Sequence, residues 1–588
     1  MSHRIQSLNI KNYRSIKELD IELQNFTPVV GQNNVGKSNI LNAIHWFIKP
    51  TKLETGDFNN LEHAVEVTGV ITGVSENILA ALSDTQRTKI EPYVSNGDIT
   101  FKRVMGAPGA ASQAKPQILN PETGDYDNNP TGISAALDGL FPEPLRVAAM
   151  SDASEDAAKN KTSTTLGKLI AKVADSIEIA EGTQLAQLFT DLGKILDPEG
   201  EHRPAEFNSF DTDANAVISE FFPGVSLKVN FPKPALSDLL KSGTVSIIED
   251  GLPGKRKFED MGHGAQRSIQ MALLKLLAEK TSQAGNPNRC SLLLIDEPEL
   301  YLHPQAIETI RIALKSLADS GYQIIFNTHS PFLIENEDMP YCNVVTKVSP
   351  VEGTKVCQRA ADAVNTIIPN DNPEKHRILF ELKNASQILF SNSVILVEGN
   401  TERVLMPHLY QTFTGRSMIQ DKVGLVCMDS CGSMHTAIEV LSMMGIKAKA
   451  VVDLDYAYKG GVRAGLIDDD DADRQVGITW FSANETAQNI TVCEEGLPKK
   501  GTDGGAEGGY HRMSQDAANA NAIANLHGKL KEKGFFCWKI GSIERVLGLA
   551  QKNSSLEFKN FVDGVKQHGE NHLAEKDEFR AFIDWNQA

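Results

Sequence analysis

The stretch Gly31-Gln-Asn-Asn-Val-Gly-Lys-Ser38 decides the fold of the first half of the chain. It has the pattern G-x-x-x-x-G-K-[ST], with an apolar, strand-like segment at 26–30 before it and a helical pattern over 39–48 behind it. In that setting the glycines let backbone N–H groups curl around a polyphosphate, and the helix N-terminus adds partial positive charge. A glycine-rich turn with an incidental Lys-Ser is the weaker alternative. The predicted phosphate-binding residues are Gly31, Asn33, Asn34, Gly36, Lys37, which would neutralise the terminal phosphates, and Ser38, which would bind Mg²⁺.

Length and composition predict a globular protein of two or three domains, because 588 residues are too many for one ordinary domain. The net charge of −18 argues against a protein coated in nucleic acid, although it allows a local basic groove. The seven cysteines form no C-x-x-C pair, which indicates a reduced protein without a zinc site. With no apolar signal core and no run of about 18 apolar residues, we expect a cytoplasmic protein without a membrane span.

The N-terminal half reads as strands, then a loop, then helices. Alternating segments near 5–10, 65–74 and 99–104 predict an antiparallel sheet beside the nucleotide, and the Gly- and Pro-rich stretch 106–131 predicts a loop. Three- and four-residue apolar steps predict a helical insertion over 152–224, whose apolar stripe would be an intramolecular core or a dimer interface. The stripe consists of Leu166, Leu169, Ile170, Leu185, Leu188, Leu192 and Leu196.

A second glycine motif begins the next helical segment. Met261-Gly-His-Gly-Ala-Gln-Arg-Ser268 opens an apolar helix, so Gly262 and Gly264 would offer bare backbone amides to a phosphate. Alone, this motif is a weak signal.

Two buried strands then end in polar residues. The run 291–295 predicts a parallel strand with Asp296 at its carboxyl end, placed to hold Mg²⁺ through water, and Glu297 next to it, placed to polarise an attacking water. The strand 323–326 leads to His329, which we expect to contact the terminal phosphate.

Together these motifs resemble the ABC-type ATPase head of SMC-like and RecF-like DNA-repair ATPases. The resemblance implies ATP as the nucleotide, with Walker A at 31–38, the signature at 262–268, Walker B at 292–297 and His329 as the switch histidine. In that family two heads sandwich ATP, so the resemblance also implies a homodimer or a higher homo-oligomer.

Carboxylates follow strands in the C-terminal part as well. Strand-like and helical segments alternate between residues 393 and 452, and the strand ends carry Glu398, Asp453 and Asp455. Because parallel strands end at the same edge of a sheet, these side chains should converge there. Clustered carboxylates raise one another's pKa unless a cation is present, and hard oxygen donors favour Mg²⁺ or Mn²⁺.

Two more carboxylates extend this set. Glu402 completes the pattern Glu-Gly-x-x-Glu, and a strand predicted at 535–540 leads to Gly541-Ser-Ile-Glu544. Glu544 is therefore expected as one more strand-end carboxylate that could supply a second metal site. The acidic run 468–473 reads as a solvated loop. The Glu-Gly-x-x-Glu and Asp-x-Asp arrangement resembles the Toprim domain of topoisomerases, primases and some nucleases.

An ABC head followed by a Toprim domain resembles the OLD (overcoming lysogenization defect) family of ATP-dependent nucleases, prokaryotic and phage-encoded proteins used in defence. That family implies two metals for phosphodiester cleavage at Glu398, Glu402, Asp453 and Asp455, with Glu544 a looser match. It also has a late basic residue, for which Lys552, Lys559 and Lys566 are equal candidates. Family members occur alone or beside a helicase-like partner.

The expected fold is therefore α/β: an ABC/SMC-like P-loop ATPase with a helical insertion, followed by a Rossmann-like Toprim domain. Its parts are 1–151 (ATPase N-terminal lobe), 152–224 (insertion), 225–385 (ATPase C-terminal lobe) and 386–588 (Toprim). The leading hypothesis is an ATP-binding, metal-dependent DNA nuclease. The alternative is a RecF- or SMC-like ATP-gated DNA clamp whose Toprim fold is not catalytic.

Overall fold

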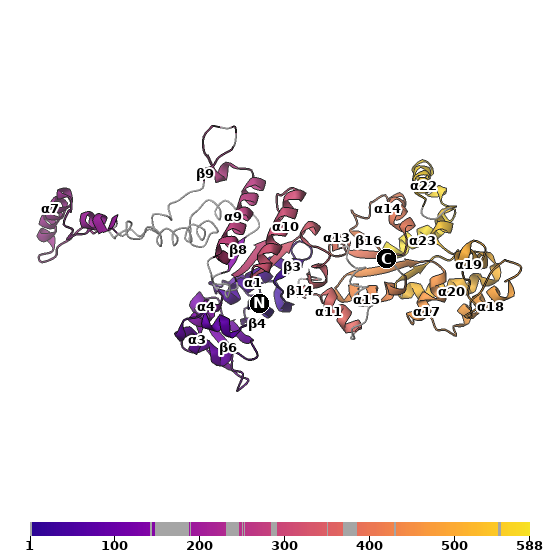
Figure 1. Cartoon of the computed structure of the whole chain (residues 1–588), viewed down its shortest axis with the longest axis horizontal. Helices are drawn as coiled ribbons and strands as arrows, with labels where there is room; N and C mark the ends of the chain where they lie inside the picture. Colours follow the sequence, from indigo (N-terminus) through magenta and orange to yellow (C-terminus); the bar gives the residue numbers. More distant parts are fainter. Residues whose placement is uncertain are drawn as a thin grey trace.

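The structure is a computed structural model. It describes residues 3–141, 144–147, 187–188, 190–230, 246–249, 251, 253–283, 291–347, 349, 351–368, 385–428, 431–550 and 554–587. Figure 1 shows an elongated molecule with helix α7 (Ala205–Phe221) at one end, two sheets of the N-terminal part in the middle and the C-terminal part at the other end. Of the predicted apolar stripe, Leu166, Leu169, Ile170 and Leu185 lie outside the described residues.

The N-terminal sheet is antiparallel throughout, as its alternating sequence predicts, with strand order β2-β1-β4-β5-β6-β7. The expected loop at 106–131 was partly wrong, because it contains two short strands. These strands pair at the edge of the sheet, so tertiary pairing with β5 overrides the local turn composition. The strands are β1 (Arg4–Tyr13), β2 (Ile16–Glu22), β4 (Val65–Thr72), β5 (Ile99–Met105), β6 (Pro116–Leu119) and β7 (Tyr126–Asn128).

The second sheet of the N-terminal part joins strands that are far apart in the sequence, in the order β14-β13-β3-β12-β11-β8. Only the edge strand β14 is antiparallel to its neighbour. Helix α1 (Lys37–Ile48) packs between the two sheets, where its face of Ile40, Leu41 and Ile44 is fully buried. The strands are β3 (Phe26–Val30), β8 (Leu145–Val147), β11 (Ser291–Asp296), β12 (Tyr322–Thr328), β13 (Asn343–Thr346) and β14 (Lys355–Val356).

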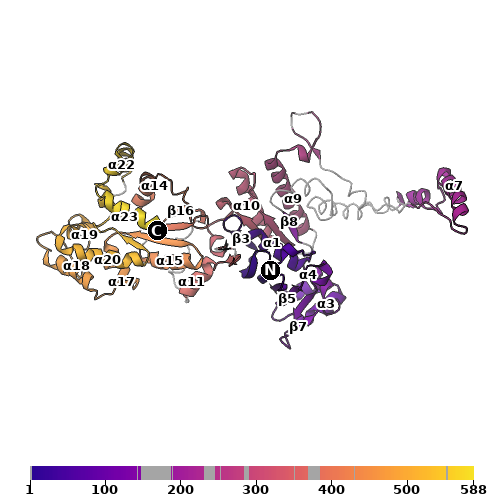
Figure 2. The same ribbon diagram turned by 180° about the vertical axis from the view of Figure 1, so that it is seen from behind.

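The C-terminal sheet is fully parallel, with strand order β16-β15-β17-β18. Helices cover both of its faces: α14 (Asn400–Thr414) and α23 (Lys576–Gln587) pack with one hydrophobic cluster, α15 (Met434–Met443) and α20 (Ala520–Glu532) with another (Figure 2). The strands are β15 (Ser393–Val397), β16 (Val423–Cys427), β17 (Lys447–Val452) and β18 (Phe535–Cys537).

Two details of the predicted C-terminal sheet were wrong. Strand β18 has three residues and does not extend to residue 540, and Glu544 is not at a strand end but in the short helix α21 (Ile543–Leu547). The turn between them contains Gly541, whose φ of 120° is a backbone conformation that other residues rarely adopt.

The N-terminal and C-terminal parts share a hydrophobic core. Helix α11 (Ala360–Ile367) packs against α15, and Val30 and Met339 belong to the same buried cluster as Val394. Each fully buried aliphatic side chain contributes about 1.5–3 kcal/mol relative to exposure. The shared core therefore stabilises one arrangement of the two parts. Among the described residues, no helix combines the length and the apolar character needed to cross a membrane.

Candidate functional site

The phosphate loop has the backbone that its glycines allow. Gly36 has φ 106° and Asn34 has φ 63°, and both values lie in the left-handed region. A Cβ at Gly36 would collide with Thr354 Oγ1 and lie 2.7 Å from Ser15 Oγ. Thr354 in turn donates a 2.7 Å hydrogen bond to the carbonyl of Val35. The loop is thus supported from outside by two distant segments that leave no room for a side chain at position 36.

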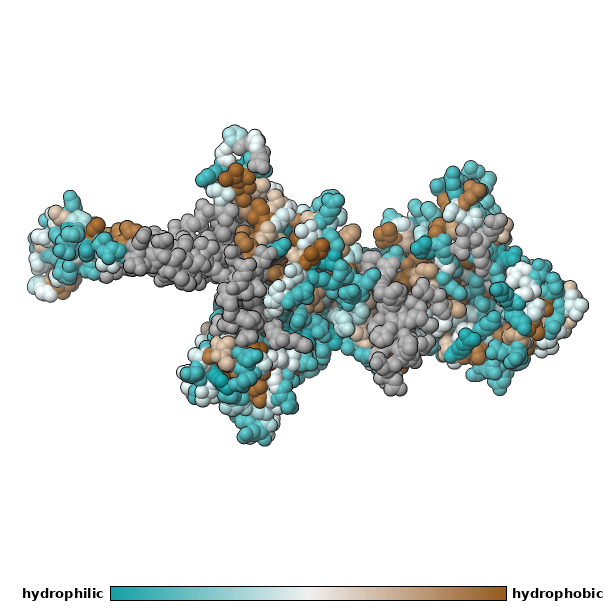
Figure 3. Space-filling view, viewed as in Figure 1, coloured by the Kyte–Doolittle hydropathy of each residue, from teal (hydrophilic) through white to brown (hydrophobic). Residues whose placement is uncertain are grey.

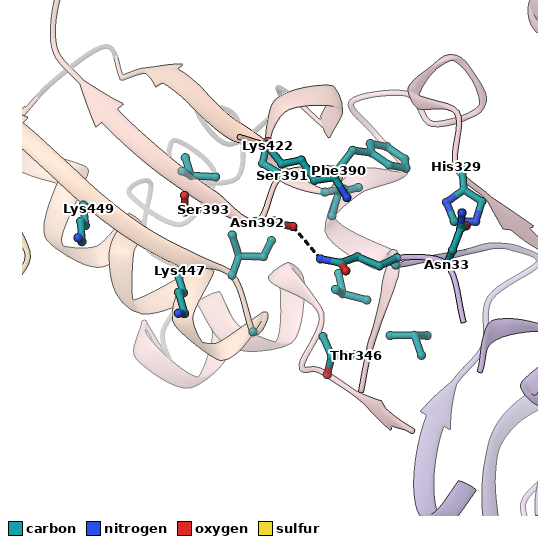
Figure 4. A pocket seen from close by; sticks show the side chains of 18 of the residues that line it. Asn33, His329, Thr346, Phe390, Ser391, Asn392, Ser393, Lys422, Lys447 and Lys449 are labelled. Atoms are coloured by element: carbon teal, nitrogen blue, oxygen red, sulfur yellow. Dashed lines mark hydrogen bonds between the residues drawn. The ribbon is translucent and has the colours of Figure 1, made fainter. Parts of the chain in front are cut away.

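Lys37 lies at the centre of this loop and is 6% exposed. Its Nζ donates to the carbonyl oxygens of Gly31 (3.0 Å) and Gln32 (2.9 Å), and it lies 2.9 Å from His329 Nε2. Burial lowers the pKa of Lys37, while the carboxylates at the end of β11 raise it. Figure 4 shows Asn33 beside His329. The predicted Walker A lysine and switch histidine are therefore adjacent.

Ser38 and Asp296 meet as the Mg²⁺ prediction requires. Ser38 Oγ donates to Asp296 Oδ1 at 3.2 Å, and Asn327 Nδ2 donates to the same oxygen at 2.7 Å. Asn327 was not singled out from the sequence. Its position at the end of β12, next to β11 in register with Asp296, is the signal that could have identified it.

Glu297 and His329 also lie together, with His329 Nε2 3.6 Å from Glu297 Oε1. Burial lowers the pKa of His329, and the charge of Lys37 lowers it further. Glu299, another residue missed from the sequence, accepts from the His329 backbone N–H (2.6 Å) and from Thr328 Oγ1 (2.9 Å). These bonds hold the backbone at His329 in place. Burial raises the pKa of Glu299.

The signature segment begins helix α9 (His263–Gln283) behind the Walker B strand. Arg267, which is 2% exposed, donates to the carbonyl oxygens of Asp296 (2.9 Å) and Glu297 (3.0 Å). A Cβ at Gly264 would lie 2.7 Å from the Tyr301 carbonyl oxygen, whereas space around Gly262 is open. Arg267 thus ties this helix to the Walker B backbone of its own chain, a role that the sequence did not reveal.

The C-terminal carboxylates gather at the carboxyl edge of their sheet. Glu398 follows β15, Asp453 follows the adjacent β17, and Asp455 begins α16 (Asp455–Tyr458). The charges of all three act on the Cys431 thiol, and together with burial, the largest cause, they raise its pKa to about 12. The three predicted carboxylates are therefore near enough to one thiol for their charges to raise its pKa.

The two remaining carboxylates lie on helices beside this edge. Glu402 is 5% exposed on α14, and a Cβ at Gly399 would lie 2.8 Å from its Oε2, so glycine makes room for that carboxylate. Glu544 Oε1 accepts a 2.8 Å hydrogen bond from Thr401 Oγ1. The Ile543 backbone N–H donates to Asp453 Oδ1 at 3.3 Å, which links α21 to the end of β17.

The donor set at this edge consists of carboxylate oxygens, the ligands that Mg²⁺ and Mn²⁺ prefer. In the described part of the chain, no group of three or more His, Cys, Asp or Glu side chains is arranged to hold a metal ion as it stands. The residue types and their shared edge fit such an ion, although the side chains would have to move closer together to hold it.

Two family models match the chain in succession. One, described as an AAA domain, putative AbiEii toxin, Type IV TA system, matches residues 26–335, and the other, the overcoming lysogenization defect protein-like TOPRIM domain, matches residues 389–455. The second range contains Glu398, Glu402, Asp453 and Asp455. The AAA domain implies ATP and the TOPRIM domain implies a divalent metal. The expected α/β fold, a P-loop ATPase followed by a Toprim domain, is confirmed.

Two similar nucleases agree with these matches. The chain is 32% identical over 596 residues to the Old nuclease of Escherichia phage P2, covering 100% of each chain. It is 24% identical over 425 residues to Endonuclease GajA of Bacillus cereus strain VD045, covering 68% of this chain and 67% of that protein. A solved SMC head bound to the C-winged helix domain of ScpA covers 60% of this chain and 97% of its own, with 15% identity and a TM-score of 0.36. By its full-length similarity to the phage P2 protein and its ATPase-then-Toprim order, the chain belongs to the OLD family of nucleases.

Proposed function

We propose that this nuclease cleaves DNA phosphodiester bonds at the carboxyl edge of the C-terminal sheet, with divalent cations held by Glu398, Asp453 and Asp455. A second cation would be held near Glu402 and Glu544. The single observation that supports this most is that Glu398 and Asp453 follow the adjacent parallel strands β15 and β17, with Asp455 two residues further on at the start of α16.

The chain's own residues would position the cations and the DNA. When bound, the cations supply activation of the attacking water and stabilisation of the leaving oxygen. Thr401 holds Glu544 in place by its 2.8 Å hydrogen bond, and the Ile543 N–H holds Asp453. In the ATPase part, Lys37 and Ser38 would bind the phosphates and Mg²⁺ of ATP, and Glu297 would orient water beside His329.

Cleavage of supercoiled and linear DNA tests this proposal, with Mg²⁺, Mn²⁺ or EDTA and with or without ATP. We expect the Asp453→Ala variant to lose cleavage by at least about 10²-fold, because removing one group that stabilises transition-state charge costs about that much. The matched control is Asp470→Ala, which removes an exposed carboxylate from the acidic loop. Equal loss in both variants, or undiminished cleavage in EDTA, contradicts the proposed site.

We also propose that helix α7 forms a contact between two copies of the chain. Phe210, Val217 and Phe221 on α7 are 56%, 56% and 72% exposed. In Figure 3 apolar surface also gathers along α9, the helix that begins with the signature segment. A second copy would cover such a face and bring the signature of one head to the phosphates of the other.

The mass in solution tests this contact. Phe210→Asp/Phe221→Asp should shift the light-scattering mass from a dimer to a monomer, while Leu556→Asp, which changes a side chain that is 69% exposed on α22 (Ser555–His568), should not. A wild-type monomer, or a double variant that remains dimeric, contradicts this use of α7.

The similarity to the OLD family also supports a role in phage defence. Phage should form fewer plaques on cells that carry the wild-type protein than on cells that carry the Asp453→Ala variant.

A further inference from the structure

A cavity of about 750 Å³ lies between the ATPase and Toprim parts (Figure 4). One wall is formed by the phosphate loop at Gly31, Gln32 and Asn33 together with His329. The other wall is the segment 389–394 and the amino ends of β15, β16 and β17. Lys37, Ser38 and Asp296 do not line it, whereas Gly31, Asn33 and His329 do, so the cavity borders the nucleotide site at the start of α1 without including its lysine and Mg²⁺ ligands. It also lies at the opposite end of the sheet from the carboxylates.

The charge of this cavity has one sign. Three lysines line it, Lys422, Lys447 and Lys449, and no aspartate or glutamate is among its lining residues. Across the described residues, the side chains of Lys422 and Lys447 have neither an ion pair nor a hydrogen bond. Lys449 donates to the carbonyl oxygens of Trp585 (2.6 Å) and Asn586 (3.2 Å). Because the whole chain carries a charge of −18, this local excess of positive charge indicates an anionic ligand.

The remaining lining groups narrow the chemistry of that ligand. Amide side chains of Asn392, Asn586 and Gln587 can donate to and accept from the polar edge of a base. The Phe390 ring lies beside Lys422 (Figure 4), where a base could stack on it. A volume of about 750 Å³ is that of a small-molecule pocket rather than of a duplex groove.

We propose that this cavity binds a nucleoside polyphosphate, distinct from the nucleotide held by Lys37 and Ser38. The lysines bind the phosphates, and Phe390 with the amides binds the base. Gln32 Nε2 donates to Asn392 Oδ1 at 2.7 Å, so the cavity is crossed by a hydrogen bond between the two parts of the chain. An occupant there contacts both the phosphate loop and the strand β15 that leads to Glu398. It therefore acts as an effector of the contact between them.

The stoichiometry of ADP binding tests this proposal. Equilibrium dialysis with the full chain and Mg²⁺ should give two ADP per wild-type chain and one for Lys37→Ala. Adding Lys422→Gln/Lys447→Gln to Lys37→Ala should weaken the remaining binding at least tenfold, because the lysine stems are kept and only the charges are lost. The matched control is Lys531→Gln/Lys533→Gln in the same Lys37→Ala background, at the end of α20, which should still bind one ADP.

Three outcomes overturn the proposal. The first is that Lys37→Ala binds no ADP, and the second is that its remaining binding is unchanged by loss of Lys422 and Lys447. The third is that a six-nucleotide single strand competes fully while ADP and ATP do not, which would assign the cavity to a DNA end. Hydrogen exchange provides a second readout in the Lys37→Ala variant. Protection of residues 387–394 and 445–449 should increase on adding ADP, and no change there would equally contradict the site.

Discussion

The ATP site and the carboxylate edge are built on the same plan but differ in how their charges are balanced. Both lie at the carboxyl ends of parallel strands. In the ATP site, Lys37 Nζ contacts His329 Nε2, and the carboxylates at the end of β11 act on its charge. At the carboxylate edge, two neutral donors, the Thr401 hydroxyl and the Ile543 N–H, bond to Glu544 and Asp453. The first site therefore places a lysine next to its carboxylates, whereas the second places neutral donors on two of its carboxylates, where we propose that cations bind.

The largest effect that would test this difference concerns His329. We expect His329→Gln to lower ATP turnover by about 10²-fold or more, the usual range for a group acting on a proton or charge in the transition state. Burial and the nearby Lys37 lower the pKa of His329, so it remains neutral at pH values where an ordinary histidine, with pKa about 6.5, is half protonated.

The pH dependence of ATP turnover tests whether the pKa of His329 is lowered. Protonation of His329 beside Lys37 is unfavourable, so the wild-type rate should stay constant as the pH falls to about 6.5 and decrease only below it. The His329→Gln variant should lack that decrease. A wild-type rate already halved at about pH 6.5 would contradict the charge balance assigned to the ATP site.

The sequence predicted the positions of Lys37, Asp296 and Asp453 in the fold better than the groups that support them. Asp296 ends a buried strand and Asp453 follows one, while Lys37 begins the helix after another, so the local pattern predicted these positions, and the roles of the residues stay predictions. Arg267 and Glu299 act by contacting backbone about 30 residues away along the chain, and no local pattern specifies such a contact.

The predictions that were wrong, a loop at 106–131 and a strand extending to residue 540, also failed because contacts between distant segments decide the structure there. The strand at 116–119 forms because it pairs with β5, and the strand at 126–128 forms because it pairs with 116–119. The local sequence does not show that the edge of β5 is available for pairing. Strand β18 stops at Cys537 because the chain then turns through Gly541, which packs against His511 from α19 (Gly505–Gln515). Glu544 reaches the carboxylate edge from a helix instead of a strand.

A smaller effect, on the metal dependence of cleavage, would test whether the neutral donor Thr401 positions Glu544 at the carboxylate edge. Thr401→Val removes the hydroxyl that donates to Glu544 and preserves the shape of the side chain. Loss of such a positioning group typically costs about 10- to 100-fold in metal affinity or activity. We expect cleavage to require correspondingly more Mn²⁺ and to recover at saturating Mn²⁺. Thr412→Val on the same helix is the control, because its hydroxyl bonds only to the His408 carbonyl. Equal metal dependence in both variants would show that Glu544 needs no positioning.

The smallest effect concerns the contact that joins the two regions. Gln32→Ala removes the 2.7 Å hydrogen bond to Asn392 and leaves the backbone groups of the phosphate loop in place. A single hydrogen bond of this kind contributes about 0.5–1.5 kcal/mol, or roughly 2- to 10-fold. The factor by which ATP changes the rate of DNA cleavage should therefore shrink by that amount, while cleavage without ATP stays the same. Gln567→Ala, an exposed glutamine on α22, should leave the factor unchanged. If Gln32→Ala leaves it unchanged too, the two sites are coupled through the shared hydrophobic core and not through the phosphate loop.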